Sequence, residues 1–172
     1  LAMQDRLGEI CGRTVGLVGH GAVARILHGI LEAMGASVLY WSRSGGNASL
    51  DELLAKSDIV SLHLPLTPET TRIIDPRCMK PGAILVNTAR GGLVDEPALI
   101  ETLQSGHVSA AGLDVFASEP LPADSPLLAL PNVVCAPHIA WLTGETLARS
   151  IAVALENVRR LRAGEALLHR VA

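Results

Sequence analysis

Short apolar runs alternate with longer amphipathic segments along this chain of 172 residues. The apolar runs lie near residues 14–18, 37–40, 59–64, 83–87, 109–115 and 133–136. They do not alternate apolar with polar positions, which is typical of strands buried on both faces of a sheet. The segments between and after them fit helices at about 22–34, 49–56, 95–105 and 143–162. Strands that alternate with helices predict an α/β fold with a doubly wound parallel sheet of the Rossmann type.

Local signals refine the expected elements. Ser49 is followed three residues later by Glu52, the spacing of a capping box, which predicts a helix start there. Residues 116–132 hold Pro120, Pro122, Pro126 and Pro131, so we expect a long loop rather than a regular element.

Composition excludes several classes of function. Fourteen Lys and Arg against 17 Asp and Glu give a net charge of −3, and aromatic residues make up 2%, so we expect no nucleic-acid partner. Cys11, Cys78 and Cys135 are odd in number and widely spaced, which predicts reduced thiols in a cytoplasmic protein and no metal site. No apolar stretch reaches the roughly 18 residues of a membrane span, and no signal peptide is indicated, so we expect no membrane association.

A glycine turn follows the first expected strand. The spacing Gly19-x-Gly21-x-x-Ala24 stands between an apolar run and an amphipathic helix, where a dinucleotide pyrophosphate is held, and alanine is an accepted variant at the third position. A structural turn is the alternative. Gly19 would make the tight turn, Gly21 would let the backbone approach phosphate, and the helix start would offer free N–H groups. The residues expected at the cofactor here are Gly19, His20, Gly21, Ala22 and Val23, although the side chain of His20 has no evident task.

The second expected strand ends without the acidic residue that normally binds the adenosine ribose of NAD. Ser42 stands where that acid is expected, and Arg43 and Ser44 follow it. A carboxylate would repel a 2′-phosphate, whereas these three residues can donate hydrogen bonds to one, with Arg43 supplying charge. The sequence therefore favours NADP(H), with NAD(H) as the alternative if Arg43 stacks on adenine or is only solvated.

Three catalytic-type side chains follow later strands. Arg90 follows the run at 83–87, Glu119 follows the run at 109–115, and His138 follows the run at 133–136. A guanidinium can hold a carboxylate through two hydrogen bonds, and a histidine paired with a carboxylate can exchange a proton near neutral pH. Together they favour hydride chemistry on a small 2-keto or 2-hydroxy acid, although each residue alone is also common as a structural group.

These motifs resemble one family closely. The chain is similar to the nucleotide-binding domain of the D-isomer-specific 2-hydroxyacid dehydrogenases, which include glyoxylate, hydroxypyruvate and phosphoglycerate dehydrogenases. Trp141, shortly after the histidine, resembles the glyoxylate and hydroxypyruvate reductase branch, although its ring could equally belong to a core or an interface. The matching stretches are Thr14–Ala24, Ser57–Thr67, Lys80–Glu96, Gly112–Phe116, Glu119–Pro120 and Pro137–Ala140.

The resemblance implies a role for each matching residue. Arg90 would bind the substrate carboxylate and keto oxygen, His138 would give or take the proton, and Glu119 would orient His138 and favour its charged form. Asp114 would contact the nicotinamide carboxamide. Further cofactor contacts are implied at His63, Leu64, Pro65, Thr67, Thr88, Ala89, Arg90, His138 and Ala140.

The resemblance also implies a second, substrate-binding domain that this chain lacks. We expect a dinucleotide-binding domain over residues 1–142 and a C-terminal helix over 143–172 that would return to the missing domain. Such a fragment is expected to bind cofactor with little turnover, because nothing would close over the substrate. A homodimer through the nucleotide-binding domain is expected, as is usual in the family. The alternative function is a nucleotide-sensing interaction module, as in relatives that act as transcriptional corepressors.

Overall fold

The computed structural model describes residues 8–170, so the outermost ends of the two expected domains lie outside the described residues. Every expected strand and helix is present, each within about two residues of its expected bounds. The strands are β1 (Thr14–Val18), β2 (Ser37–Trp41), β3 (Ile59–Leu62), β4 (Ala83–Asn87), β5 (Val108–Leu113) and β6 (Val133–Cys135). The helices are α1 (Ala22–Ala33), α2 (Leu50–Lys56), α3 (Glu96–Ser105) and α4 (Gly144–Ala163).

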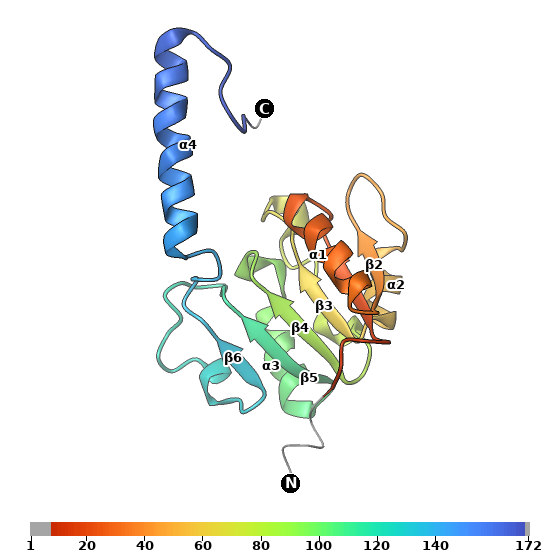
Figure 1. The fold of residues 1–172 in the computed structure, drawn as a ribbon. Helices are drawn as coiled ribbons and strands as arrows, with labels where there is room; N and C mark the ends of the chain where they lie inside the picture. The colour runs from red at the N-terminus through yellow and green to blue at the C-terminus, as the bar shows by residue number, and fades with distance from the viewer. Residues whose placement is uncertain (1–7, 171–172) are drawn as a thin grey trace. The chain divides into compact units, whose positions relative to one another are not determined.

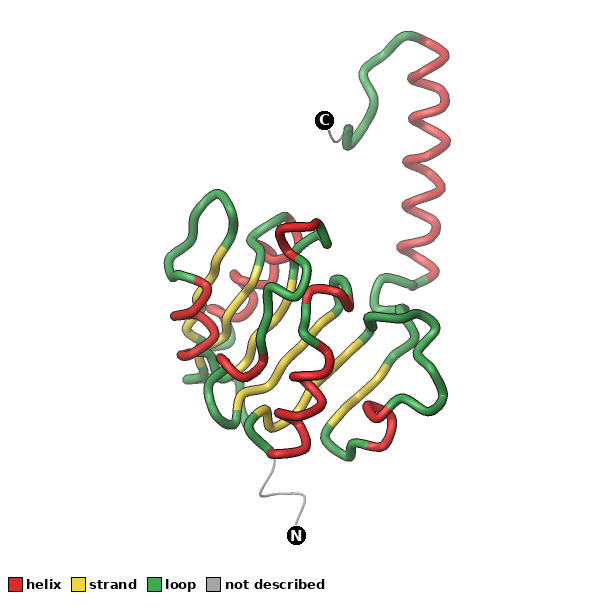
Figure 2. The backbone as a smooth tube through the Cα atoms, turned by 180° about the vertical axis from the view of Figure 1, so that it is seen from behind, coloured by secondary structure: helices red, strands yellow, loops and turns green. Residues whose placement is uncertain are grey.

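The six strands form one parallel sheet in the order β2-β1-β3-β4-β5-β6 (Figures 1 and 2). The chain adds β2 on one side of β1 and then crosses to add β3 on the other side, which confirms the doubly wound fold. In open parallel sheets, ligands bind outside the carboxyl ends of the strands near this change of direction. The loops after β1, β2 and β3 therefore mark where a cofactor site is expected.

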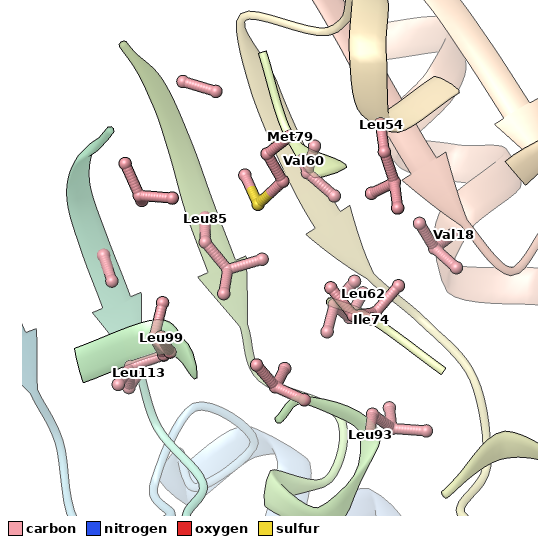
Figure 3. Packing of buried hydrophobic residues seen from close by; sticks show 14 of the residues in the cluster. Val18, Leu54, Val60, Leu62, Ile74, Met79, Leu85, Leu93, Leu99 and Leu113 are labelled. Atoms are coloured by element: carbon pink, nitrogen blue, oxygen red, sulfur yellow. The ribbon is translucent and has the colours of Figure 1, made fainter. Parts of the chain in front are cut away.

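The core has two layers, one on each face of the sheet. On one face Ala24 and Leu31 of α1 pack with Val15, Leu17 and Val38. On the other face, leucines of α2 and α3 pack against β3, β4 and β5, and Figure 3 shows part of this larger cluster. The alternation of β1 explains the division, because successive side chains of a strand point to opposite faces.

Local chemistry sets the helix ends. The Ser49 hydroxyl accepts a hydrogen bond from the Glu52 amide at 3.2 Å, as the capping pattern predicts. Asp95 caps α3 through the Ala98 amide. The expectation of a featureless loop over residues 116–132 is wrong in part, because a short 3₁₀ helix spans Pro126–Ala129, where proline at the first position fits such a turn.

The chain divides into two compact units between His138 and Ile139. In the second unit, Thr143 caps α4 and Gly164 ends it with a φ of 68°. Arg159 of this helix pairs with Glu156 and Glu165, so its charge is partly neutralised within the unit. The exposed apolar residues along α4 are Leu147, Ile151, Leu155, Val158 and Leu161. None of the helices within residues 8–170 combines the length and the apolar character needed to cross a bilayer.

Candidate functional site

At Gly19, the glycine turn after β1 has no room for a side chain. Gly19 has a φ of 99°, and a Cβ placed on it would lie 2.5 Å from the carbonyl oxygen of His63. Its amide donates to the carbonyl of Trp41 at 2.8 Å. One residue thus joins the ends of β1, β2 and β3, which explains why glycine is needed here.

The start of α1 is open toward solvent. Gly21 is the N-cap and offers no side-chain cap, and a Cβ on it would meet nothing within 4 Å. The first turn has no acidic residue, Ala22 and Val23 are exposed, and Ala24 is fully buried against the sheet. Free N–H groups without a competing carboxylate suit an anion, so this turn fits the pyrophosphate of a dinucleotide.

The loop after β2 holds the three residues expected near the adenosine ribose. The Ser42 hydroxyl donates to the Gly45 carbonyl at 2.6 Å and lies 3.1 Å from the Ser44 hydroxyl. Arg43 is exposed and has no hydrogen bond or ion pair with any residue in 8–170. It lies near enough to Glu69 to contribute to lowering the pKa of that carboxyl, after two larger contributions from hydrogen bonds of Thr67 and of the Glu69 backbone.

Hydrogen bonds within the loop after β3 define its shape. His63 Nε2 lies 3.0 Å from the Ser61 hydroxyl, and burial lowers the pKa of His63. Leu64 is buried, and the Thr70 hydroxyl donates to the Pro65 carbonyl. The Thr67 amide donates to the same hydroxyl at 2.7 Å. This loop therefore presents a fixed wall beside the glycine turn.

His20 occupies a place that the sequence did not indicate. Its ring stacks on Tyr40 of β2, with ring centroids 3.9 Å apart and an angle of 20° between the planes. Its Nε2 lies 3.1 Å from Nδ1 of His28 on α1. The ring is thus fixed between the turn and the first helix, and its position depends on contacts between elements that periodicity does not reveal.

The loop after β4 positions Arg90 through its own backbone. Asn87 accepts a hydrogen bond from the Ala89 amide and donates to the Arg90 carbonyl, which closes a tight loop around the exposed Thr88. Gly91 then packs on the backbone of Phe116, so closely that a Cβ would lie 1.9 Å from its carbonyl carbon. Glycine here lets the loops after β4 and β5 touch. The sequence analysis assigned no role to Asn87 or Gly91, although both lie in the stretch that carries Arg90.

The loop after β5 positions Glu119. The buried Asp114 donates its amide to the Asn87 carbonyl at 3.0 Å. The Phe116 amide then donates to Glu119 Oε1 at 3.0 Å. The Ala117 amide donates to Glu96 of α3, which fixes the loop from the other side. The backbone of its own loop, through the Phe116 amide, therefore fixes one oxygen of the Glu119 carboxylate.

His138 and Glu119 form a pair. His138 Nδ1 lies 2.8 Å from Glu119 Oε2, and His138 has a φ of 56°, a strained conformation of the kind found at functional sites. The His138 ring is the largest cause that lowers the pKa of Glu119, followed by the Phe116 amide, and Arg90 adds to the effect. The structure thus pairs Glu119 with His138 at the carboxyl ends of β5 and β6, and Arg90 after β4 lies near enough to Glu119 to contribute to this shift.

A cavity of about 620 Å³ opens beside this pair. It is lined by His138 and Glu119 and by the mostly apolar residues Phe116, Pro120, Leu121, Leu128, Cys135, Ala136 and Pro137. Ala140 and Trp141, also named by the sequence, lie in the second unit and are exposed there. Among residues 8–170, no three or more His, Cys, Asp or Glu side chains gather as metal ligands.

Comparison with known proteins gives a single family. The model of the D-isomer specific 2-hydroxyacid dehydrogenase NAD-binding domain matches residues 2–140. A D-3-phosphoglycerate dehydrogenase of Mycobacterium leprae is 46% identical over 170 residues, covering 91% of this chain and 32% of that protein. A glyoxylate reductase of Aeropyrum pernix is 44% identical over 163 residues, covering 87% and 49%.

A solved structure shows the same fold. The NAD-complexed D-isomer specific 2-hydroxyacid dehydrogenase of Lactobacillus delbrueckii matches with a TM-score of 0.88 and 34% identity, over 95% of this chain and 57% of that one. This chain thus spans about a third to a half of the length of the curated relatives it matches.

Proposed function

Because the chain belongs to the D-isomer-specific 2-hydroxyacid dehydrogenases through their NAD-binding domain, we propose that it serves hydride transfer between a nicotinamide cofactor and a small D-2-hydroxy or 2-keto acid. The observation that carries this proposal is the Glu119–His138 pair, with Arg90 near Glu119, on the sheet edge that also holds the glycine turn. Glyoxylate and hydroxypyruvate are the proposed acids, supported by the names of similar relatives.

The cofactor would lie across the loops after β1, β2 and β3. The turn at Gly19–Val23 would hold the pyrophosphate, the loop from His63 to Thr67 the central portion, and Asp114 with Thr88 and Ala89 the nicotinamide side. When bound, the nicotinamide supplies or accepts the hydride. NADP(H) is the proposed cofactor, because Arg43 has no partner among the described residues and no acid stands at Ser42. The nearby Glu69 works against it.

The acid would lie against the loops after β4, β5 and β6. Arg90 would bind the carboxylate of the substrate and stabilise negative charge on the carbonyl oxygen. In reduction, protonated His138 would donate its proton to that oxygen, and in oxidation neutral His138 would take it back. Glu119 would hold the ring through Nδ1 and so leave Nε2 for the substrate.

This chain by itself is proposed to bind cofactor with little turnover. The side chains of His138 and Glu119 are 40% and 36% exposed, so water reaches the groups that would act on the substrate. Reactions of this kind depend on closing the site around the reacting atoms. We propose a dinucleotide-binding domain over residues 1–142, followed by a C-terminal helix over 143–172 that would return to a substrate-binding domain.

A homodimer through the nucleotide-binding domain is also proposed. Val134 on the edge strand β6 is 72% exposed and Ile84 of β4 is 36% exposed, although parallel sheets are usually covered on both faces. Sedimentation at several protein concentrations would measure the assembly state. A chain that stays monomeric at all of them would contradict this part of the proposal.

The test is a titration of the chain with NADPH and with NADH, followed by quenching of Trp41 and Trp141 fluorescence. We expect NADPH to bind more tightly, and Arg43→Ala to weaken NADPH roughly tenfold while changing NADH less than about twofold, because one charge-assisted contact is lost. Arg72→Ala, an exposed arginine of another loop, serves as the matched control. Equal affinity for NADPH and NADH would favour NAD(H) as the cofactor, and binding of neither would contradict the proposed function.

A second measurement addresses the acid. Glyoxylate or hydroxypyruvate is added to the cofactor-saturated chain, and oxidation of the reduced cofactor is followed for the wild type and for His138→Gln. We expect slow oxidation that the variant lowers by roughly 10²-fold or more, since proton transfer contributes at least that much. A rate that His138→Gln leaves unchanged would contradict the proposed role of His138.

A further inference from the structure

The strongest feature that the proposed function does not use is the cluster of rings around His20. The ring of His20 lies on Tyr40, and its Nε2 faces Nδ1 of His28 at 3.1 Å. On the far side of His28, Nε2 lies 3.4 Å from the carboxylate of Glu32. The groups therefore form a chain that runs from a carboxylate on α1, through two imidazoles, to a residue inside the glycine turn.

The order of these hydrogen-bonded groups decides which ring nitrogens carry protons. With its proton on Nε2, His28 donates to Glu32 and leaves Nδ1 as an acceptor, and His20 then donates from its own Nε2. Neutral His20 has no proton left for Nδ1 and presents a lone pair there, which repels an anion. Protonated His20 adds a second N–H and a positive charge, both of which attract an anion.

These hydrogen-bonded groups lie where the glycine turn meets the end of β2, two segments that the proposed function assigns to the cofactor. His20 lies between Gly19 and Gly21, and the Arg25 guanidinium donates to its backbone carbonyl at 3.1 Å. Tyr40 directly precedes Trp41, whose carbonyl accepts the Gly19 amide. The ring is therefore held at the turn itself and cannot swing freely away from it.

The charged and titratable groups that face His20 within residues 8–170 are Arg25, His28 and Tyr40, with Glu32 behind His28. Burial, followed by His28 and Arg25, lowers the pKa of His20 from its usual value. The uncharged form of the ring is therefore more favoured in the free protein than in an unperturbed histidine. An anion placed beside it acts in the opposite direction and favours its charged form.

We propose that His20 is a positioning residue for a phosphate of the dinucleotide, and that its imidazole takes up a proton as that phosphate binds. This inference rests on the proposed function, because the phosphate belongs to the proposed cofactor. Two phosphates are possible sources: the pyrophosphate, which NADH and NADPH share, and the 2′-phosphate, which only NADPH carries. Cofactor affinity should fall as pH rises through the pKa of His20 in the complex.

Calorimetric titration of the 172-residue chain in two buffers of different ionisation enthalpy measures the protons taken up on binding. We expect net uptake near pH 7 with the wild type and none with His20→Phe, which keeps a ring on Tyr40 but cannot titrate. We also expect each cofactor whose binding takes up the proton to bind about threefold to tenfold more tightly near pH 6 than near pH 8, and His20→Phe to reduce this ratio to below about twofold. Uptake with both cofactors identifies the pyrophosphate, and uptake with NADPH alone identifies the 2′-phosphate.

Two further variants make the assignment specific. His107→Gln is the matched control. His107 directly precedes β5 and contacts the Met79 carbonyl, so its substitution should leave the proton uptake unchanged. His28→Gln keeps an acceptor for His20 but removes the second titratable ring, so the uptake should persist. Loss of the proton uptake in His28→Gln would place the proton on His28 and overturn its assignment to His20. Binding of both cofactors without proton uptake would overturn this inference alone, whereas binding of neither would overturn the proposed function as well.

Discussion

At the carboxyl ends of β1, β2 and β3, backbone shape defines the candidate site, whereas at the ends of β4, β5 and β6 side chains define it. The first half is built on Gly19, whose missing Cβ lets the turn meet the loop after β3, and on the uncapped start of α1. The second half is built on the Glu119–His138 pair, with Arg90 of a third loop near enough to help lower the pKa of Glu119. A group that is common to all nucleotides can be held by backbone N–H groups, but proton transfer to one atom needs particular side chains.

Because of this difference, substitutions in the two halves should have different effects. A change in the first half should alter shape, and therefore both folding and cofactor affinity. A side-chain change in the second half should remove chemistry while leaving the fold nearly intact, because these three side chains are at least partly exposed.

Gly91→Ala should have the largest effect, and it tests whether the second half also depends on backbone shape. The added Cβ would overlap the Phe116 backbone, which cannot move aside as a flexible side chain could. We expect the free energy of unfolding to fall by roughly 3 kcal/mol or more, measured by urea denaturation. Gly112→Ala is the control, because a Cβ there meets nothing within 4 Å. Equal stability of the two variants would contradict the close contact of the loops.

Gly19→Ala and Gly21→Ala separate folding from binding within the first half. At Gly19 the positive φ and the contact with His63 should lower the free energy of unfolding by roughly 2 kcal/mol. At Gly21 the φ is −78° and the space is open, so the loss should stay below about 1 kcal/mol. NADH affinity should nevertheless fall roughly tenfold, because the new methyl group lies where phosphate would approach. Unchanged affinity in Gly21→Ala would place the phosphate elsewhere.

Glu119→Gln should have the smallest effect on stability. The pKa of Glu119 is lower in the folded protein than in the unfolded chain, mainly through the hydrogen bond with His138. Its contribution is therefore complete above the unfolded pKa near 4.5 and is lost as pH falls through the folded pKa. Because the side chain is 36% exposed, we expect less than about 1 kcal/mol.

Urea denaturation near pH 6 and near pH 3 measures this contribution. The wild type should lose more stability between the two conditions than Glu119→Gln does. Glu101→Gln, an exposed carboxyl on α3, is the control. Parallel losses in the wild type and Glu119→Gln would show that the pair with His138 does not stabilise the fold.

The sequence predicted the fold well because its signals are local. Buried parallel strands are continuous apolar runs, and the residues that begin helices, such as Ser49, lie next to the helices that they cap. The short turns were harder, and the 3₁₀ helix at Pro126–Ala129 was missed because Pro126 and the prolines around the helix also fit an irregular loop. Element type followed from periodicity, whereas the detail of the loops did not.

The candidate site was predictable only in its main residues. Arg90, Glu119 and His138 each follow a strand, so their meeting at one sheet edge could be expected from the topology. The close contact at Gly91 and the stacking of His20 on Tyr40 join segments far apart in the chain, which no spacing rule describes. The positive φ of His138 is likewise a feature that no local pattern predicts, because residues other than glycine adopt it in only a few per cent of cases.

The strand order also has a consequence for the time course of folding. Strands β2, β4, β5 and β6 each pair with the strand that precedes them in the chain, whereas β3 pairs with β1, joining Val15 to Ile59. Closing a longer loop costs more entropy and slows contact formation. We therefore expect the β1–β2 pair and the β3–β6 strands to form first and to join later, so that during synthesis the turn at Gly19 emerges early yet takes its shape only after His63 has followed.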